Sequence, residues 1–257
     1  MINNIETQQI LDIAVEAGKA ILAVYNDPKQ DFNITKKEDS SPLTIADKIS
    51  HEIISDGLVK LYPNIPVLSE EGKDIPYADR KDWEYYWCVD PLDGTKEFIK
   101  RNGEFTVNIA LMHNNVPVFG VIYIPVQDLL YYGDKDSGSY KQVPGQAPIQ
   151  IRADKRAADW VAVGSRSHAD AEEEAVLDKY PITEFIAVGS SVKFCMIAEG
   201  KAHFYFRKGP TMEWDTAAGQ AIANFSGCTV ETLAGKALPY NKPSLLNGSF
   251  LCRVKHN

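Results

Sequence analysis

The stretch Tyr85-Tyr86-Trp87-Cys88-Val89-Asp90-Pro91-Leu92-Asp93-Gly94-Thr95 decides how this sequence is interpreted. Its first five residues are aromatic or apolar and predict a buried strand that stops at Asp90-Pro91. Two carboxylates and a glycine follow at once. A tight turn with Asx hydrogen bonds would use the same residue types, but it would not require an apolar run leading directly into two acids. The stretch therefore predicts a pair of carboxylates at the end of a buried strand.

Three further acidic motifs lie elsewhere in the chain: Ala46-Asp47, Ser69-Glu70-Glu71-Gly72 and Trp214-Asp215. Glu70 follows a short apolar strand, and Asp215 opens a helix of small residues. Side chains at strand ends and helix starts can converge on a crevice, and carboxylate oxygens are the ligands that Mg²⁺ prefers. Each motif also has a simpler interpretation: a surface position for Asp47, a solvated pair for Glu70 and Glu71, and a helix cap for Asp215.

The acidic motifs together resemble a known family. Trp-x-Val-Asp-Pro-Leu-Asp-Gly-Thr-x-x-Phe at 87–98 and Trp-Asp-x-Ala-Ala-Gly at 214–219 are similar to the two signature motifs of the inositol monophosphatase superfamily. These lithium-sensitive, magnesium-dependent phosphatases include inositol monophosphatases, fructose-1,6-bisphosphatases and bisphosphate nucleotidases. A haloacid dehalogenase motif would separate its two aspartates by one residue, and no Gly-Lys pair is followed by the Ser or Thr of a P-loop. Both rival phosphate chemistries are therefore disfavoured.

Within the superfamily, four segments resemble bacterial 3'(2'),5'-bisphosphate nucleotidases of the CysQ type more than inositol monophosphatases. They are residues 67–71, 93–111, 165–168 and 189–195. The resemblance implies a phosphomonoesterase that converts adenosine 3',5'-bisphosphate, and also its 3'-phosphosulfate analogue, to products such as AMP and phosphate in sulfate assimilation. One alternative is an inositol or sugar monophosphatase on the same frame. An alternative of another class is a non-catalytic nucleotide or metal sensor, although the acidic set has no gap.

The same resemblance implies a role for individual residues. Two or three Mg²⁺ ions would be held by Glu70, Asp90, the Leu92 carbonyl, Asp93 and Asp215, and the pair Asp47 and Thr95 would orient and deprotonate the attacking water. The implied substrate contacts are Glu70, Leu92, Asp93, Gly94, Thr95, Ser167, His168, Gly189, Ser190, Lys193 and Asp215. Simpler interpretations stay open for the contacts outside the acidic motifs: a surface lysine, a loop histidine, and a solvated basic face made of Lys96, Lys100 and Arg101.

Composition limits the partners and the compartment. The formal net charge is −8, and the sequence has no long basic run, which argues against a nucleic-acid polymer as partner. The four cysteines form no C-x-x-C pair, so we expect buried free thiols in a reducing cytosol. The sequence has no signal-peptide pattern and no apolar stretch of membrane-spanning length. We expect a cytoplasmic protein; some relatives associate with the inner face of the membrane, and the oligomeric state is left open.

The expected fold is of the α+β class, the layered αβαβα sandwich implied by the resemblance, with residues 1–257 as one catalytic unit. Approximate lobes are 1–145 and 146–257, divided within the Gly- and Pro-rich segment 134–148. Apolar periodicity predicts helices at 7–25 and 44–61, the second with Ile45, Ile49, Ile53 and Leu58 inward. An antiparallel meander is expected from strands 85–89, 105–112, 118–124 and 129–133. Later elements are expected to alternate: strands at 160–163, 185–188 and 203–206, and helices at 169–179, 191–199 and 215–225.

Overall fold

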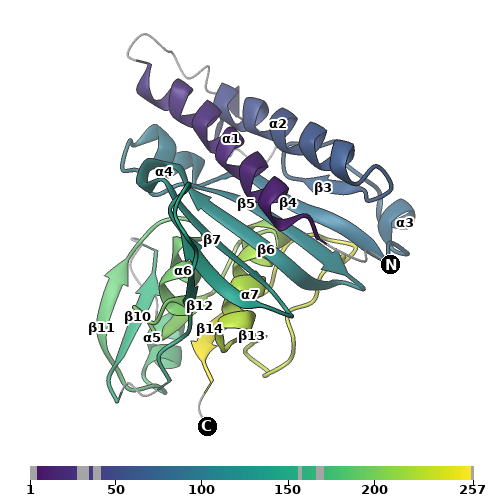
Figure 1. Cartoon of the computed structure of the whole chain (residues 1–257). Helices are drawn as coiled ribbons and strands as arrows, with labels where there is room; N and C mark the ends of the chain where they lie inside the picture. The colour runs from purple at the N-terminus through teal and green to yellow at the C-terminus, as the bar shows by residue number, and fades with distance from the viewer. Residues whose placement is uncertain (1–4, 28–34, 37–41, 156–157, 166–170, 256–257) are drawn as a thin grey trace.

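The computed structural model describes residues 5–27, 35–36, 42–155, 158–165 and 171–255. Five layers follow one another (Figure 1). Helices α1 (Thr7–Asn26) and α2 (Ile45–Leu61) cover one face of a seven-stranded sheet, and α6 (Val192–Ala198) and α7 (Glu213–Ser226) cover its other face. A five-stranded sheet lies beyond α6 and α7, and α5 (Ala171–Leu177) contacts it. The expected αβαβα sandwich of the α+β class is confirmed.

The seven-stranded sheet has the order β3-β4-β5-β6-β7-β8-β9. Only its first pair is parallel, so the predicted antiparallel meander is confirmed. The sheet also continues past residue 145, because β9 pairs with β8, which pairs with β7. The division into two lobes stays a prediction. The strands are β3 (Val67–Ser69), β4 (Tyr85–Asp93), β5 (Thr106–His113), β6 (Val116–Ile124), β7 (Leu129–Asp134), β8 (Gly138–Gln142) and β9 (Ile149–Ile151).

The five-stranded sheet has the order β11-β10-β12-β14-β13. The predicted strands of this half are present, but the last two strands of the chain had not been predicted. Strand β14 inserts antiparallel between β12 and β13. The strands are β10 (Trp160–Gly164), β11 (Ile182–Ala187), β12 (Phe204–Arg207), β13 (Cys228–Thr232) and β14 (Phe250–Val254). Shorter elements are β1 (Thr35–Lys36), β2 (Pro42–Leu43), α3 (Tyr77–Arg80), α4 (Thr95–Ile99) and the 3₁₀ turn η1 (Pro125–Gln127).

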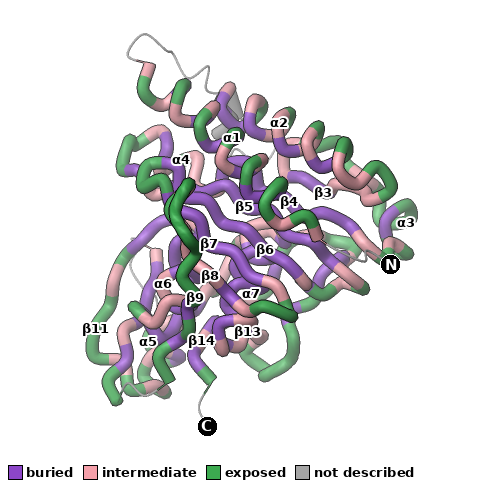
Figure 2. The backbone as a smooth tube through the Cα atoms, viewed as in Figure 1, coloured by how far each residue is buried: buried purple, intermediate pink, exposed green. Residues whose placement is uncertain are grey.

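Strand β4 explains why its sequence is apolar without alternation. Successive side chains of a strand point to opposite faces, and both faces of this sheet are covered (Figure 2). Tyr86 and Cys88 enter the core between the two sheets, whereas Trp87 and Val89 enter the core beneath α1 and α2. A strand buried on both faces needs apolar residues at every position. The strand therefore carries its terminal acids to the middle of the molecule.

Helix α2 presents a different face from the one we predicted. Leu58 is buried, as expected, but Ile45, Ile49 and Ile53 are only partly buried. The fully buried positions include Ala46, Asp47, Ser50 and Ile54. Ser50 Oγ donates to the carbonyl of Pro91 at 2.7 Å. The three isoleucines still pack against the core beneath α1 and α2, so the prediction is right in part. The helix is rotated so that polar side chains also reach the end of β4.

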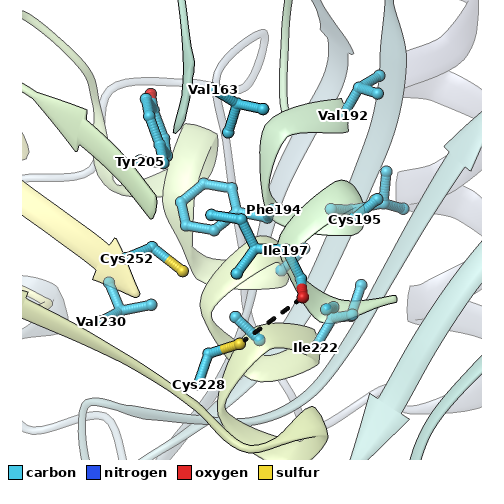
Figure 3. Close-up of a cluster of buried hydrophobic side chains, with 14 of the residues drawn as sticks. Val163, Val192, Phe194, Cys195, Ile197, Tyr205, Ile222, Cys228, Val230 and Cys252 are labelled. Atoms are coloured by element: carbon cyan, nitrogen blue, oxygen red, sulfur yellow. Dashed lines mark hydrogen bonds between the residues drawn. The ribbon is translucent and has the colours of Figure 1, made fainter. Parts of the chain in front are cut away.

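The four cysteines are free and buried, as predicted. Cys228 and Cys252 lie on the paired strands β13 and β14 beside Phe194 and Ile197 of α6 (Figure 3). Cys228 Sγ lies 4.0 Å from the Ile197 carbonyl oxygen. These thiols act as small apolar side chains in the core between α6 and the second sheet. Among the described residues, no helix is long and apolar enough to cross a membrane.

Candidate metal centre and active site

A β-bulge at the end of β4 brings two carboxylates to one side of the strand. The sequence predicted that this strand stops at Asp90-Pro91. Strand β4 instead continues to Asp93. Asp90 pairs with Asn108 and Asp93 with Thr106, so β4 has one extra residue between these two pairs. Residues three apart in a regular strand point to opposite faces, and a one-residue bulge cancels that reversal. The spacing Asp-Pro-Leu-Asp therefore places both acids on the face that bears the site.

Three predicted metal ligands form a compact carboxylate group. Glu70, Asp90 and Asp215 each place one oxygen within 4.8 Å of the others. Burial raises the pKa of Asp90 well above its ordinary value, and the neighbouring Glu70, Asp93 and Asp215 raise it further. Burial likewise raises the pKa of Asp215, with Asp93 as the next largest cause. Such a group needs positive charge to be fully ionised at neutral pH, and all-oxygen donors suit a hard divalent cation.

Asp93 and Leu92 line the same cavity of about 580 Å³ as these three acids. Two hydrogen bonds in series fix the Asp93 carboxylate. Ser191 Oγ donates to Asp93 Oδ2 at 2.6 Å, and Asn108 Nδ2 donates to Ser191 Oγ at 2.9 Å. Asp215 does cap its helix, since Met212 N donates to Asp215 Oδ2 at 2.8 Å. The Asp215 side chain therefore caps α7 and belongs to the acidic group at the same time. All five predicted ligands line one cavity.

The predicted catalytic pair is also in contact. Thr95 Oγ1 lies 3.2 Å from Asp47 Oδ1 and 3.4 Å from the Leu92 carbonyl oxygen. Asp47 is only 2% exposed, which excludes the surface interpretation. Its other oxygen, Oδ2, accepts hydrogen bonds from Thr44 N at 2.8 Å and Thr44 Oγ1 at 2.6 Å. The start of α2 thus fixes the Asp47 carboxylate with Oδ1 directed at Thr95.

Gly94 connects β4 to α4 in a conformation that other residues avoid. Its φ is +93°, in the left-handed region that favours glycine. A Cβ atom there would lie 3.1 Å from the Glu104 carbonyl oxygen and 3.3 Å from Ser190 Cβ. The backbone at Gly94 therefore runs close to the loop that contains Ser190, and both residues line a second cavity.

This second cavity, of about 360 Å³, adjoins the acidic one and shares Asp93, Gly94 and Asp215 with it. The predicted contacts Gly189, Ser190 and Lys193 line it. So do four cationic side chains in all: Lys96, Lys100, Lys193 and Arg207. The basic cluster predicted from sequence is divided, because Lys96 and Lys100 face the cavity whereas Arg101 donates to the Tyr25 carbonyl at 2.6 Å.

Lys193 is a buried cation, and the surface-lysine interpretation is wrong. Its side chain donates to the carbonyls of Val188 at 2.9 Å and Ser190 at 2.8 Å. Burial lowers the pKa of Lys193 to about 8, partly offset by the charge of Asp93. The backbone of Gly189 is fixed in turn, because its N–H donates to Glu104 Oε2 at 2.6 Å.

Two predicted contacts, Ser167 and His168, lie outside the described residues. Three residues of the site, Asn108, Ser191 and Arg207, were not predicted from the sequence. Asn108 carried a signal, since it is a lone amide in the apolar strand Val107-Asn108-Ile109-Ala110. Arg207 carried none, because its place beside Lys193 depends on how β12 meets α6.

Sequence comparison places the chain in a family. The profile of the inositol monophosphatase family matches residues 6–256. The chain belongs to the inositol monophosphatase family. Among curated members of this family, the 3'(2'),5'-bisphosphate nucleotidase CysQ of Escherichia coli K12 is 46% identical over 244 residues, covering 94% of this chain and 97% of the relative. CysQ of Buchnera aphidicola is 40% identical over 255 residues, with coverages of 97% and 95%.

Solved structures of the inositol monophosphatase family share the fold. CysQ from Bacteroides thetaiotaomicron, described as a bacterial member of this family, superposes with a TM-score of 0.85 at 45% identity and covers 97% of each chain. An inositol monophosphatase from Anabaena gives a TM-score of 0.74 at 24% identity, covering 97% of this chain and 92% of its own. The second likeness bears on the fold alone.

Proposed function

We propose that this family member is a 3'(2'),5'-bisphosphate nucleotidase. It hydrolyses the 3'-phosphate of adenosine 3',5'-bisphosphate, and of the phosphosulfate analogue, in sulfate assimilation. The observation that carries the proposal is a pair of adjoining cavities. The first is lined by Glu70, Asp90, Asp93 and Asp215, Lys96 lines both, and the second adds the cations Lys100, Lys193 and Arg207. A substrate with one phosphate needs only the first cavity, whereas a bisphosphate places its second phosphate against the cations. The relatives named CysQ support the same substrate class.

We propose two or three Mg²⁺ ions as the cofactor. Glu70, Asp90, Asp93, Asp215 and the Leu92 carbonyl would hold them, and this donor set fits the ion because all its atoms are oxygens. Divalent cations at such sites act as Lewis acids toward phosphoryl oxygens and offset their negative charge. The residues supply the rest: Ser191 and Asn108 fix Asp93, and the bulge at Pro91 orients Asp90.

The attacking water is positioned by Thr95. Its hydroxyl accepts the water proton as it passes its own proton to Asp47 Oδ1, 3.2 Å away. Asp47 can act as base because the two bonds from Thr44 hold it in place. The N–H groups that follow Gly94 at the start of α4 receive the phosphate oxygens. We also propose a cytoplasmic location, which the four buried free thiols support; association with the inner face of the membrane stays a prediction.

A comparative phosphatase assay tests the function. We expect Mg²⁺-dependent phosphate release from adenosine 3',5'-bisphosphate at a far higher kcat/KM than from inositol 1-phosphate, with inhibition by Li⁺. A preference for the inositol or a sugar phosphate would establish the alternative monophosphatase instead. If the purified protein released no phosphate but bound the nucleotide, it would be a sensor. Each outcome selects one function.

Lys193 gives a sharper test of the second cavity. We expect Lys193→Met to raise KM for adenosine 3',5'-bisphosphate about 10- to 100-fold, because a charge-assisted hydrogen bond contributes roughly 1.5–3 kcal/mol. With 3'-AMP, which lacks the 5'-phosphate, KM should change little. Steady-state kinetics with both substrates measures the difference, and the exposed Lys179→Met serves as control. Equal effects on both substrates would contradict the assignment.

The same residue predicts a pH dependence. The pKa of Lys193 is about 8, so the side chain is cationic below that pH and neutral above it. KM of the wild type for the bisphosphate should therefore rise as pH increases through about 8. The Lys193→Met variant should lose this rise, because no cation remains to be deprotonated. A pH profile of KM that is identical in both proteins would count against the role.

A further inference from the structure

A buried ion pair, Glu213–Lys242, lies next to the start of α7, the helix that carries Asp215. Glu213, at the first position of α7, is 0% exposed. Its carboxylate accepts hydrogen bonds from Asn241 N at 2.7 Å, Lys242 N at 3.1 Å and Lys242 Nζ at 2.6 Å. These donors belong to the segment 239–247 between β13 and β14. We call this segment the clamp loop.

The clamp loop also holds the backbone that leads into α7. Glu213 N donates to the Leu245 carbonyl at 3.0 Å, and Asn247 N donates to the Thr211 carbonyl at 2.8 Å. Asn247 Nδ2 donates to the Met212 carbonyl at 2.7 Å. The amide of Met212 in turn donates to Asp215 Oδ2. The group that orients the Asp215 carboxylate is therefore itself fixed by the clamp loop.

Arg80 ties the clamp loop to α3. It is 2% exposed, and it donates to Asn241 Oδ1 at 2.7 Å and to the Lys242 carbonyl at 2.8 Å. Asn241 Nδ2 returns a bond to the Arg80 carbonyl at 2.8 Å. Arg80 ends α3, which follows Glu70 in the chain. One buried network thus joins the segment that carries Asp215 to α3, which is far from it in sequence.

We propose that the Glu213–Lys242 pair is a positioning device that sets the affinity of the site for divalent cations. The inference rests on the proposed function, because it takes Asp215 as a metal ligand. Glu213 lines neither cavity, so it would act on a bound ion only through Asp215. A buried ion pair is weak evidence for stability, since apolar replacements are often neutral. Groups that orient metal ligands, by contrast, change metal affinity about 10- to 100-fold when mutated.

The experiment measures Mn²⁺ binding to the metal-free full chain by electron paramagnetic resonance, alongside the Mg²⁺ dependence of turnover. Glu213→Gln should weaken Mn²⁺ binding and raise the half-activating Mg²⁺ concentration by the same factor, about 10- to 100-fold. At saturating Mg²⁺, kcat should stay near the wild-type value. Glu231→Gln is the matched control, because Glu231 pairs with Arg253 at 2.8 Å on β13 and β14, away from both cavities. It should leave both metal readouts unchanged.

Two variants of Lys242, the partner of Glu213, test the inference if Glu213→Gln does not fold. Lys242→Met should weaken Mn²⁺ binding, and Lys242→Arg, which keeps the charge, should restore most of the lost affinity. Unchanged Mn²⁺ affinity in Glu213→Gln or Lys242→Met would overturn the inference, as would equal losses in Glu231→Gln. Failure of the wild type itself to bind Mn²⁺ would instead overturn the proposed metal site.

Discussion

Asp90→Asn is expected to reduce turnover to below about one thousandth of the wild-type rate, because it removes a carboxylate ligand that would hold Mg²⁺ at the reacting phosphate. Asp90 is 1% exposed and lies within the Glu70–Asp215 group. Asp93→Asn should have the same effect, since the two acids share one face of the bulged strand. The assay is Mg²⁺-dependent phosphate release from adenosine 3',5'-bisphosphate.

Stability without metal should change in the opposite direction. The folded protein raises the pKa of Asp90 above its ordinary value, so the ionised carboxylate destabilises the metal-free fold at neutral pH. Removing the charge should therefore raise Tm in the presence of a chelator, while the increase in Tm that Mg²⁺ produces should shrink. The exposed Asp82→Asn, whose side chain is 88% exposed, should change neither rate nor Tm. A near-normal rate in Asp90→Asn would refute the ligand assignment.

The sequence predicted the elements that place the acids, because their signals are local. An apolar run that ends in Asp90 indicates a buried strand, and Thr44 followed by a periodic segment indicates the start of α2. The bulge in β4 was not predictable, since it is defined only by the pairing of Asp90 and Asp93 with β5. Strands β13 and β14, which pair with each other, were not predicted either; β14 also pairs with β12, with which it is not consecutive in the chain.

The prediction of which face of α2 is buried was only partly right, for a different physical reason. Apolar periodicity assumes that the buried face of a helix is its most apolar face. Here the buried face must also deliver Asp47 to Thr95 and Ser50 to the Pro91 carbonyl. Hydrogen bonds satisfy these buried polar groups, so the rotation is tolerated. The deviation from the expected pattern therefore coincides with the proposed catalytic pair, Asp47 and Thr95.

Thr95→Ala is expected to lower kcat about 100- to 10,000-fold, the usual contribution of positioned acid–base groups. KM for adenosine 3',5'-bisphosphate should change little, because the cations of the second cavity are untouched. Thr95→Ser keeps a hydroxyl near Asp47 and should retain most of the rate. Thr229→Ala on β13 controls for the loss of a threonine hydroxyl and should be silent. A large rise in KM with unchanged kcat would contradict the role of Thr95.

Asp47→Asn provides the test of the relay itself. Thr95 Oγ1 and Asp47 Oδ1 act in series in the proposed proton transfer, so removing either should abolish the same step. Groups that act as a unit are strongly non-additive. The double variant Thr95→Ala/Asp47→Asn should therefore be no slower than the slower single variant. If the two rate losses instead multiplied, each residue would be acting on its own, and Asp47 would serve only to anchor the start of α2 through Thr44.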